Sequence, residues 1–133
     1  MKGDTNLTRE ETIERLKSLG YPIVLNENGY LVCTGYNFSN QDLRDLNFGG
    51  CDLGVADFSG ADLRGTNFTG AYLRQATFSD TKLEGSCFLY TNLWLVHVRA
   101  NSPEEADIDA WIMKMIRSIL RFPRKISGLD HGD

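Results

Sequence analysis

Few side chains in this sequence have the types and spacing that catalysis or metal binding requires. The 133 residues include two histidines, His97 and His131, and neither belongs to a run of ligands at metal-binding spacing. The three cysteines, Cys33, Cys51 and Cys87, include no CxxC pair. They are typical of small buried apolar residues in a reducing compartment rather than of a disulfide framework. We therefore expect no metal, no cofactor and no catalytic residue.

Aspartate and asparagine are frequent, but they recur at a fixed interval instead of forming catalytic pairs. They stand directly before a large apolar residue in eight of thirteen units, at Asn37, Asp42, Asn47, Asp52, Asp57, Asp62, Asn67 and Asn92. Short polar side chains of this kind bond to the backbone two residues later and so stabilise turns. No GxSxG, HExxH, GxGxxG or P-loop motif is present. The aspartates therefore predict corners in the backbone, not acid–base chemistry.

The elements that carry these residues form a five-residue repeat from about Tyr36 to Ala100. Every fifth residue is large and apolar: Phe38, Leu43, Phe48, Leu53, Phe58, Leu63, Phe68, Leu73, Phe78, Leu83, Phe88, Leu93 and Val98. The residue two places earlier is mostly small, and glycine is common two places later. A period of five fits neither an α-helix nor an alternating strand. We infer a coil that turns a corner in every unit and buries one large and one small residue.

Units such as Ala-Asp-Phe-Ser-Gly (56–60) and Ala-Asp-Leu-Arg-Gly (61–65) resemble the pentapeptide-repeat family, whose consensus is A(D/N)LXX. The resemblance implies an all-β solenoid, a right-handed quadrilateral β-helix with four units per coil and about three coils here. Phenylalanines would then form two ladders and leucines the other two. The units from 71 to 100 depart from the consensus, because their Asn/Asp position holds Tyr72, Thr77, Lys82, Cys87 and His97. The last coil is therefore expected to be less regular.

Residues 1–35 are expected to cap the first coil, because a solenoid end exposes its core and unpaired backbone. The pair Thr8 and Glu11 predicts a capping box at the start of a helix over 8–19, and Gly20 predicts its end. A hairpin over 23–33, with its turn at 26–29, is expected to lead into the first coil.

Residues 101–133 are expected to form a C-terminal helix, over 103–121, and a tail. Ser102, Pro103 and Glu105 are typical of a helix start. The apolar residues of this helix span about 200° of the helical wheel, which is wider than one packing face. We expect one flank to cover the solenoid and the other to meet a second copy in a two-fold dimer; the alternative is a helix folded back on a monomer. The predicted interface comprises Leu89, Tyr90, Trp94, Leu95, Ile108, Trp111, Ile112, Met115, Ile116 and Ile119.

Charge and composition exclude several functional classes. The net charge is −4, and acids and bases are spread evenly along the chain, which argues against nucleic-acid binding. The polar N-terminus indicates no signal peptide, and no apolar run is long enough to cross a membrane. We expect a cytoplasmic, bacterial protein that acts as a non-enzymatic scaffold or protein–protein interaction module, as a homodimer.

The resemblance also admits a second function. Within the pentapeptide-repeat family, acidic rod-shaped dimers mimic duplex DNA and protect DNA gyrase from quinolones. Three coils would be only ~15 Å long, about four base-pair steps, and a duplex carries two charges per step. The repeat region here has seven acids and five bases. Gyrase protection is therefore the alternative prediction, behind the interaction module.

Overall fold

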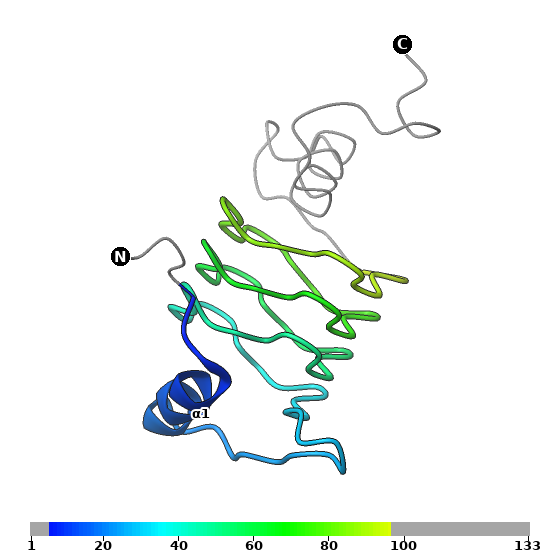
Figure 1. Cartoon of the computed structure of the whole chain (residues 1–133). Coiled ribbons are helices and arrows are strands. Elements are labelled where there is room, and N and C mark those ends of the chain that lie inside the picture. Colours follow the sequence, from blue (N-terminus) through cyan, green and yellow to red (C-terminus); the bar gives the residue numbers. More distant parts are fainter. Residues whose placement is uncertain (1–5, 97–133) are drawn as a thin grey trace.

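The backbone turns a corner once in every five-residue unit of the computed structural model, which describes residues 6–96 of the chain (Figure 1). At most corners the carbonyl of the large core residue accepts a hydrogen bond from the N–H three residues later, as Phe58 does from Ala61 at 2.9 Å. The residue two places after the large one has a positive φ at every corner. Glycine adopts this conformation without steric cost, which explains its recurrence at positions such as Gly60 and Gly65.

The predicted Asx turns are all present. Each of the eight Asn and Asp side chains named above accepts a hydrogen bond through Oδ1 from the N–H two residues later, at 2.9 to 3.2 Å. The side chain thus accepts the backbone N–H just before the corner, which makes no hydrogen bond to a neighbouring coil.

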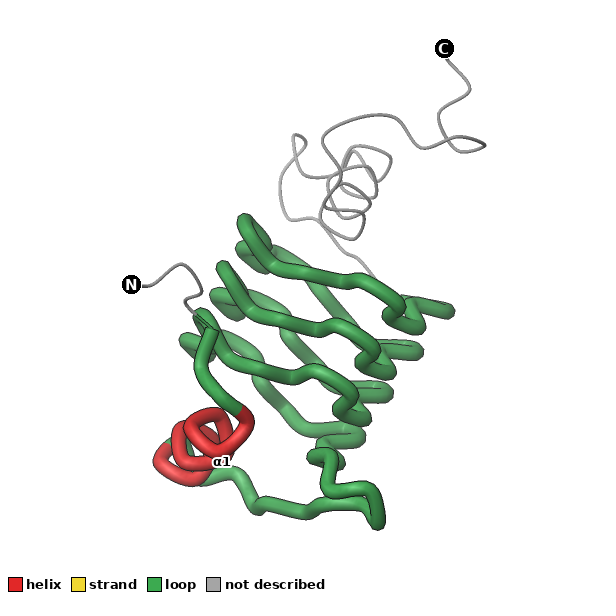
Figure 2. The backbone as a smooth tube through the Cα atoms, viewed as in Figure 1, coloured by secondary structure: helices red, strands yellow, loops and turns green. Residues whose placement is uncertain are grey.

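Units twenty residues apart lie one above the other. Parallel bridges join Asn37 to Asp57 and Asp57 to Thr77, and the same interval recurs along the stack. The N–H of Phe38 donates to the carbonyl of Asp57 at 2.8 Å, and the N–H of Asp57 donates to the carbonyl of Tyr36 at 3.0 Å. Four units therefore make one coil, as the quadrilateral β-helix predicts. Corners follow each other so closely that the bridges remain isolated, and Figure 2 shows stacked coils drawn as loops rather than strands.

The four sides of the coil are called A to D below. Side A contains 36–40, 56–60 and 76–80; side B contains 41–45, 61–65 and 81–85; side C contains 46–50, 66–70 and 86–90; side D contains 31–35, 51–55, 71–75 and 91–95.

The core consists of the predicted ladders. On side A, the ring centroid of Phe58 lies 5.2 Å from that of Phe38 and 5.1 Å from that of Phe78. On side C, the ring of Phe68 lies 5.7 Å from Phe48 and 4.9 Å from Phe88. These six rings are fully buried, and the two ladders meet edge to face. Stacking within each ladder and edge contacts between them suit the quadrupole of the aromatic ring.

The coil begins one unit before the first repeat predicted from the sequence. Leu31 and Cys33 are fully buried, and Val32 bridges in parallel to Asp52. The unit has Gly35 at its corner, but the large Leu31 stands at the usually small position and the small Cys33 at the usually large one. This exchange of sizes explains why the five-residue pattern did not reveal the unit. Immediately before it, Leu25 bridges antiparallel to Leu31, as expected for the hairpin.

Helix α1 (Arg9–Ser18) lies against the first coil, as Figure 1 shows. Thr8 and Glu11 form the predicted capping box, and Gly20 has φ +93° just after the helix. Leu16 is fully buried in the solenoid core. Thr12 is fully buried too, which its polar side chain did not suggest. Within residues 6–96, no helix is long and apolar enough to cross a membrane.

Thr12 replaces a missing ladder partner. In the second coil, the N–H of Asn67 donates to the carbonyl of Leu46 in the coil below at 2.9 Å. Asn47 occupies the same place in the first coil, and its N–H donates instead to Oγ1 of Thr12 at 2.9 Å. The aromatic ladder of side A is extended in the same way, because the ring of Tyr21 lies 4.7 Å from that of Phe38.

Several predictions concern residues outside 6–96. The C-terminal helix over 103–121, His97 and Val98 lie there. The division into 1–35, 36–100 and 101–133 and the right-handed sense of the coil stay predictions.

Replacement of Phe68 by alanine should lower the free energy of unfolding by about 3–5 kcal/mol, because it leaves a cavity in a core that cannot collapse around it. Phe68 touches the rings of both ladders. Urea unfolding followed by circular dichroism measures the loss. Phe68→Leu fills part of the space and should cost less; a loss below about 1 kcal/mol for alanine would contradict the ladder.

Thr12→Val should lower the free energy of unfolding by about 1–3 kcal/mol, because the valine leaves the Asn47 N–H buried without an acceptor. Thr12→Ser keeps the hydroxyl and is the matched control. The same urea titration compares the three proteins. A valine variant as stable as wild type would show that the helix does not complete the ladder.

Candidate interaction surface

The structure divides the predicted interface between two sides of the last described coil. Leu89 and Tyr90 lie on side C, whereas Trp94 and Leu95 lie on side D. Tyr90 is 88% exposed, Trp94 57% and Leu95 49%, and Leu89 is half-buried. The other predicted interface residues lie outside 6–96, at Ile108, Trp111, Ile112, Met115, Ile116 and Ile119. The exposed residues of this group thus share one coil and are divided between two of its sides.

On side C, glycine occupies both corners below Tyr90. The corner position of this side holds Gly70 in the coil below and Gly50 in the first coil. The ring of Tyr30 covers Gly50, where an added Cβ would come within 2.5–3.1 Å of ring atoms, and the Arg9 guanidinium lies 4.6 Å from the centre of that ring. The N-terminal cap therefore reaches onto this side at the first coil only.

Side D holds an aromatic and cationic stack that sequence reasoning missed. The guanidinium carbon of Arg74 lies 4.4 Å from the ring centre of Trp94. Nη1 of Arg74 also approaches the hydroxyl of Tyr72 at 3.4 Å. The Tyr72 ring lies beside Gly54, where an added Cβ would meet Cδ2 at 3.7 Å. Trp94 was predicted as an interface residue because it is a large aromatic residue. Arg74 lies twenty residues earlier, one full coil away, so the sequence pattern near Trp94 did not indicate it.

The corners of side D are unusual. The first holds Gly35, but the positive-φ position of the next three holds Val55, Gln75 and Leu95, with φ of 60°, 63° and 57°. A side chain in this region costs about 1–2 kcal/mol relative to glycine, and a β-branched one is a true outlier. Side A contrasts with this pattern, since an added Cβ at Gly60 would collide with the Asn40 side-chain oxygen. Val55 is 56% exposed, so no core packing explains the strain.

Acidic and basic side chains alternate on side B. Arg44 makes two 2.8 Å hydrogen bonds to the carboxylate of Asp42, and Arg64 binds Asp62 at 2.8 and 2.6 Å. These bonds hold the pKa of Asp42 down to about 2 and lower that of Asp62. The third unit carries Lys82-Leu83-Glu84, with the two charges exchanged. The second and third coils therefore place opposite charges side by side, whereas the like charges of the first and second coils are neutralised within their own units.

The cysteines show no reactive environment. Cys33 and Cys51 are buried, and burial is the main cause that raises the pKa of their thiols to about 12 and about 11. Cys87 is half-buried, and its sulfur lies 3.4 Å from the hydroxyl of Thr69. Among residues 6–96, no three His, Cys, Asp or Glu residues come together as metal ligands.

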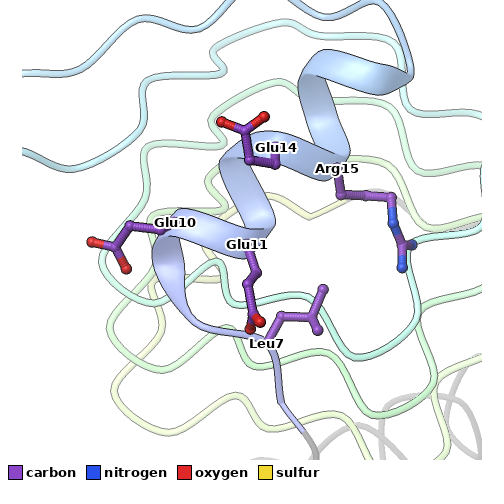
Figure 3. Close-up of a pocket in the computed structure, with 5 residues that line it drawn as sticks. All are labelled: Leu7, Glu10, Glu11, Glu14 and Arg15. Carbon is purple, nitrogen blue, oxygen red and sulfur yellow. The ribbon is translucent and has the colours of Figure 1, made fainter.

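An open pocket lies along α1, lined by Leu7, Glu10, Glu11, Glu14 and Arg15 (Figure 3). Glu11 already accepts the Thr8 N–H at 2.9 Å in the capping box, and Glu14 pairs with Lys17 at 3.5 Å. The acids therefore have structural roles at the helix start, where negative charge is favourable.

Known proteins share the repeat. Residues 56–88 match the family described as pentapeptide repeats, in eight copies. No curated protein shows significant similarity to the chain.

The solved structures that are similar to the chain include three pentapeptide repeat proteins. A pentapeptide repeat protein from the Arabidopsis thaliana thylakoid lumen is 36% identical over 52% of this chain and 48% of its own, with a TM-score of 0.49. One from Nostoc Pcc 7120 is 24% identical over 72% of this chain and 79% of its own, with a TM-score of 0.46. One from the cyanobacterium Cyanothece 51142 is 23% identical over 53% and 50%, with a TM-score of 0.28. The chain spans about half the length of the Arabidopsis protein.

The Asp42–Arg44 pair predicts a dependence of stability on pH. The folded-state pKa of Asp42, about 2, lies below its ordinary value of 3.8. Its stabilising contribution is therefore complete above about pH 4 and is lost as the pH falls toward 2. Asp42→Asn should make the free energy of unfolding fall less steeply over this range in urea titrations. Arg44→Gln should do the same because it removes the donor; unchanged slopes in both variants would contradict the pairing.

Proposed function

We propose that this chain, whose residues 56–88 are pentapeptide repeats, is a non-enzymatic scaffold that binds other proteins and forms a homodimer. Pentapeptide repeat proteins are generally structural or interaction proteins, and this module belongs to that general class. The single observation that carries the proposal is the display of large apolar side chains at the last described coil. Tyr90, Trp94 and Leu95 are all roughly half exposed or more there.

Such exposure is costly unless a partner covers it. An exposed apolar cluster on a small protein usually marks an interaction surface, and Trp and Tyr are the residues most enriched at binding hot spots. The coil also holds these residues rigidly, because Trp94 N–H bonds to Asn92 at 3.0 Å and its ring stacks on Arg74. A rigid aromatic side chain loses little conformational entropy on binding.

The dimer part of the proposal is based on the apolar pattern in the sequence of residues 103–121. Its apolar positions Ile108, Ile112, Met115 and Ile119 follow one helical stripe, and Trp111 and Ile116 widen it beyond one packing face. In this proposal one flank covers the last coil and the other meets the same helix of a second copy. A cytoplasmic, bacterial setting is part of the same proposal.

Gyrase protection remains the alternative. No observation on the described sides favours it, since Arg44 and Arg64 neutralise the aspartates of side B within their own units. A mimic of duplex DNA needs rows of unpaired negative charge.

The proposal is tested with two measurements on the full chain. Sedimentation equilibrium should give a dimer at concentrations on the order of tens of micromolar, and Ile112→Glu should shift it to a monomer. Affinity capture from extracts of the source organism, quantified by mass spectrometry, should recover the same proteins with wild type and with Ser59→Ala, a change on side A. Trp94→Ala should reduce that recovery severalfold.

The two measurements separate the parts of the proposal. A clean monomer would overturn the homodimer. Equal recovery with wild type and Trp94→Ala would overturn the binding function of the last coil.

A further inference from the structure

We propose that side D binds an apolar protein segment that carries a carboxylate, along the line from Val55 through Tyr72 and Arg74 to Trp94 and Leu95. This inference rests on the proposed function and names the surface and the chemical class of the partner. Four of the five residues expose between 40% and 57% of their surface. They lie in three successive coils, so the surface runs along the stack rather than across its end.

Three corners of side D combine a strained backbone with an exposed side chain. Thirteen corners have a positive φ, and glycine, asparagine or aspartate occupies nine of them. Three of the remaining four are Val55, Gln75 and Leu95, which lie above one another on this side. The fold therefore keeps an unfavourable conformation in three coils, at positions where the side chain points to solvent. Strain that packing does not explain is typical of functional surfaces.

The charge of Arg74 indicates what the partner supplies. Three units place arginine directly after the core leucine, and in two of them the residue before the leucine is aspartate, which binds the guanidinium. In the third unit Tyr72 stands at that position, so Arg74 has no such carboxylate. Within the described residues its guanidinium meets a tyrosine hydroxyl and an indole ring, and its buried Nε has no hydrogen-bond acceptor.

These features are complementary to one kind of occupant. Arginine binds carboxylates strongly through charge-assisted hydrogen bonds, and an aromatic ring beside the guanidinium keeps it oriented. Val55 and Leu95 flank the charge with aliphatic surface, and Trp94 adds an aromatic one. An aspartate or glutamate on the partner would pair with Arg74 while neighbouring apolar side chains cover Val55 and Trp94. A second copy of the chain and its own C-terminal segment are the rival occupants.

The experiment selects ligands for the full chain from a phage-displayed library of random peptides about twelve residues long. We expect the enriched peptides to share an acidic residue close to aromatic or aliphatic ones. Affinities are then measured by fluorescence polarisation with the labelled peptides. Arg74→Gln should weaken binding roughly tenfold, as loss of a hydrogen bond between charged groups does. The matched control, Arg64→Gln on side B, should change the affinity less than about twofold.

A second variant tests the strained corner. Val55→Gly removes the exposed side chain and relieves the positive φ. It should leave the melting temperature equal to or above that of wild type and weaken peptide binding about threefold. This combination distinguishes a binding surface from a packing position, because loss of a packing residue would lower the melting temperature.

Four outcomes would overturn the inference. The first is an enriched set without acidic residues, or no enrichment at all. The second is an equal effect of Arg74→Gln and Arg64→Gln. The third is conversion of a sedimenting dimer to monomer by Arg74→Gln, which would identify a second copy as the occupant. The fourth is competition by a peptide of residues 103–121 that displaces every selected peptide, which would assign the surface to the chain itself.

The result also separates this inference from the proposed function. Binding that falls with Trp94→Ala but not with Arg74→Gln would leave the interaction module intact and remove the acidic partner. Binding that is insensitive to both would remove both.

Discussion

The corner that closes every five-residue unit is the constraint on which the rest of the structure depends. It requires a positive φ two places after the core residue and a hydrogen bond back across the turn. Asn and Asp supply a second bond through their side chains. Because four such corners return the chain to its starting point, each core residue lies above the one twenty residues earlier, and the phenylalanine ladders follow from the corners.

A stack of coils has ends, and the first end shows how a different element can complete the same ladder. Helix α1 contributes no strand, yet Thr12 accepts the N–H that a lower coil would have bonded, and Leu16 fills the core beneath. Tyr21 continues the aromatic ladder from outside the repeat. The cap therefore continues three features of the coil: its hydrogen-bond ladder, its apolar core and its aromatic stack.

The surface is most informative where it departs from the repeat. The first two units of side B follow the rule, and their arginines are neutralised within their own units. Side D breaks it twice, with Tyr72 in place of the aspartate and with Val55 and Leu95 in place of glycine at the corner. The first departure leaves the Arg74 cation without the carboxylate of its own unit, and the second exposes aliphatic surface. Departures of this kind, where they have no structural compensation, are expected at functional positions.

The sequence by itself determined the repeat, the inward-facing ladders, the Asx turns, the capping box of α1 and the even spread of charge along the chain. All of these depend on neighbours within about five residues or on strict periodicity, which a linear pattern records. It did not reveal the unit at Leu31 and Cys33, the bond from Asn47 to Thr12 or the stack of Arg74 under Trp94. Those contacts join residues twenty or more positions apart, which become neighbours only when the coils stack on one another and on the N-terminal cap. The tertiary structure therefore decided where the exposed residues lie: Tyr90 and Trp94 are near in sequence but lie on different sides, whereas Val55 and Leu95 are distant in sequence and share one.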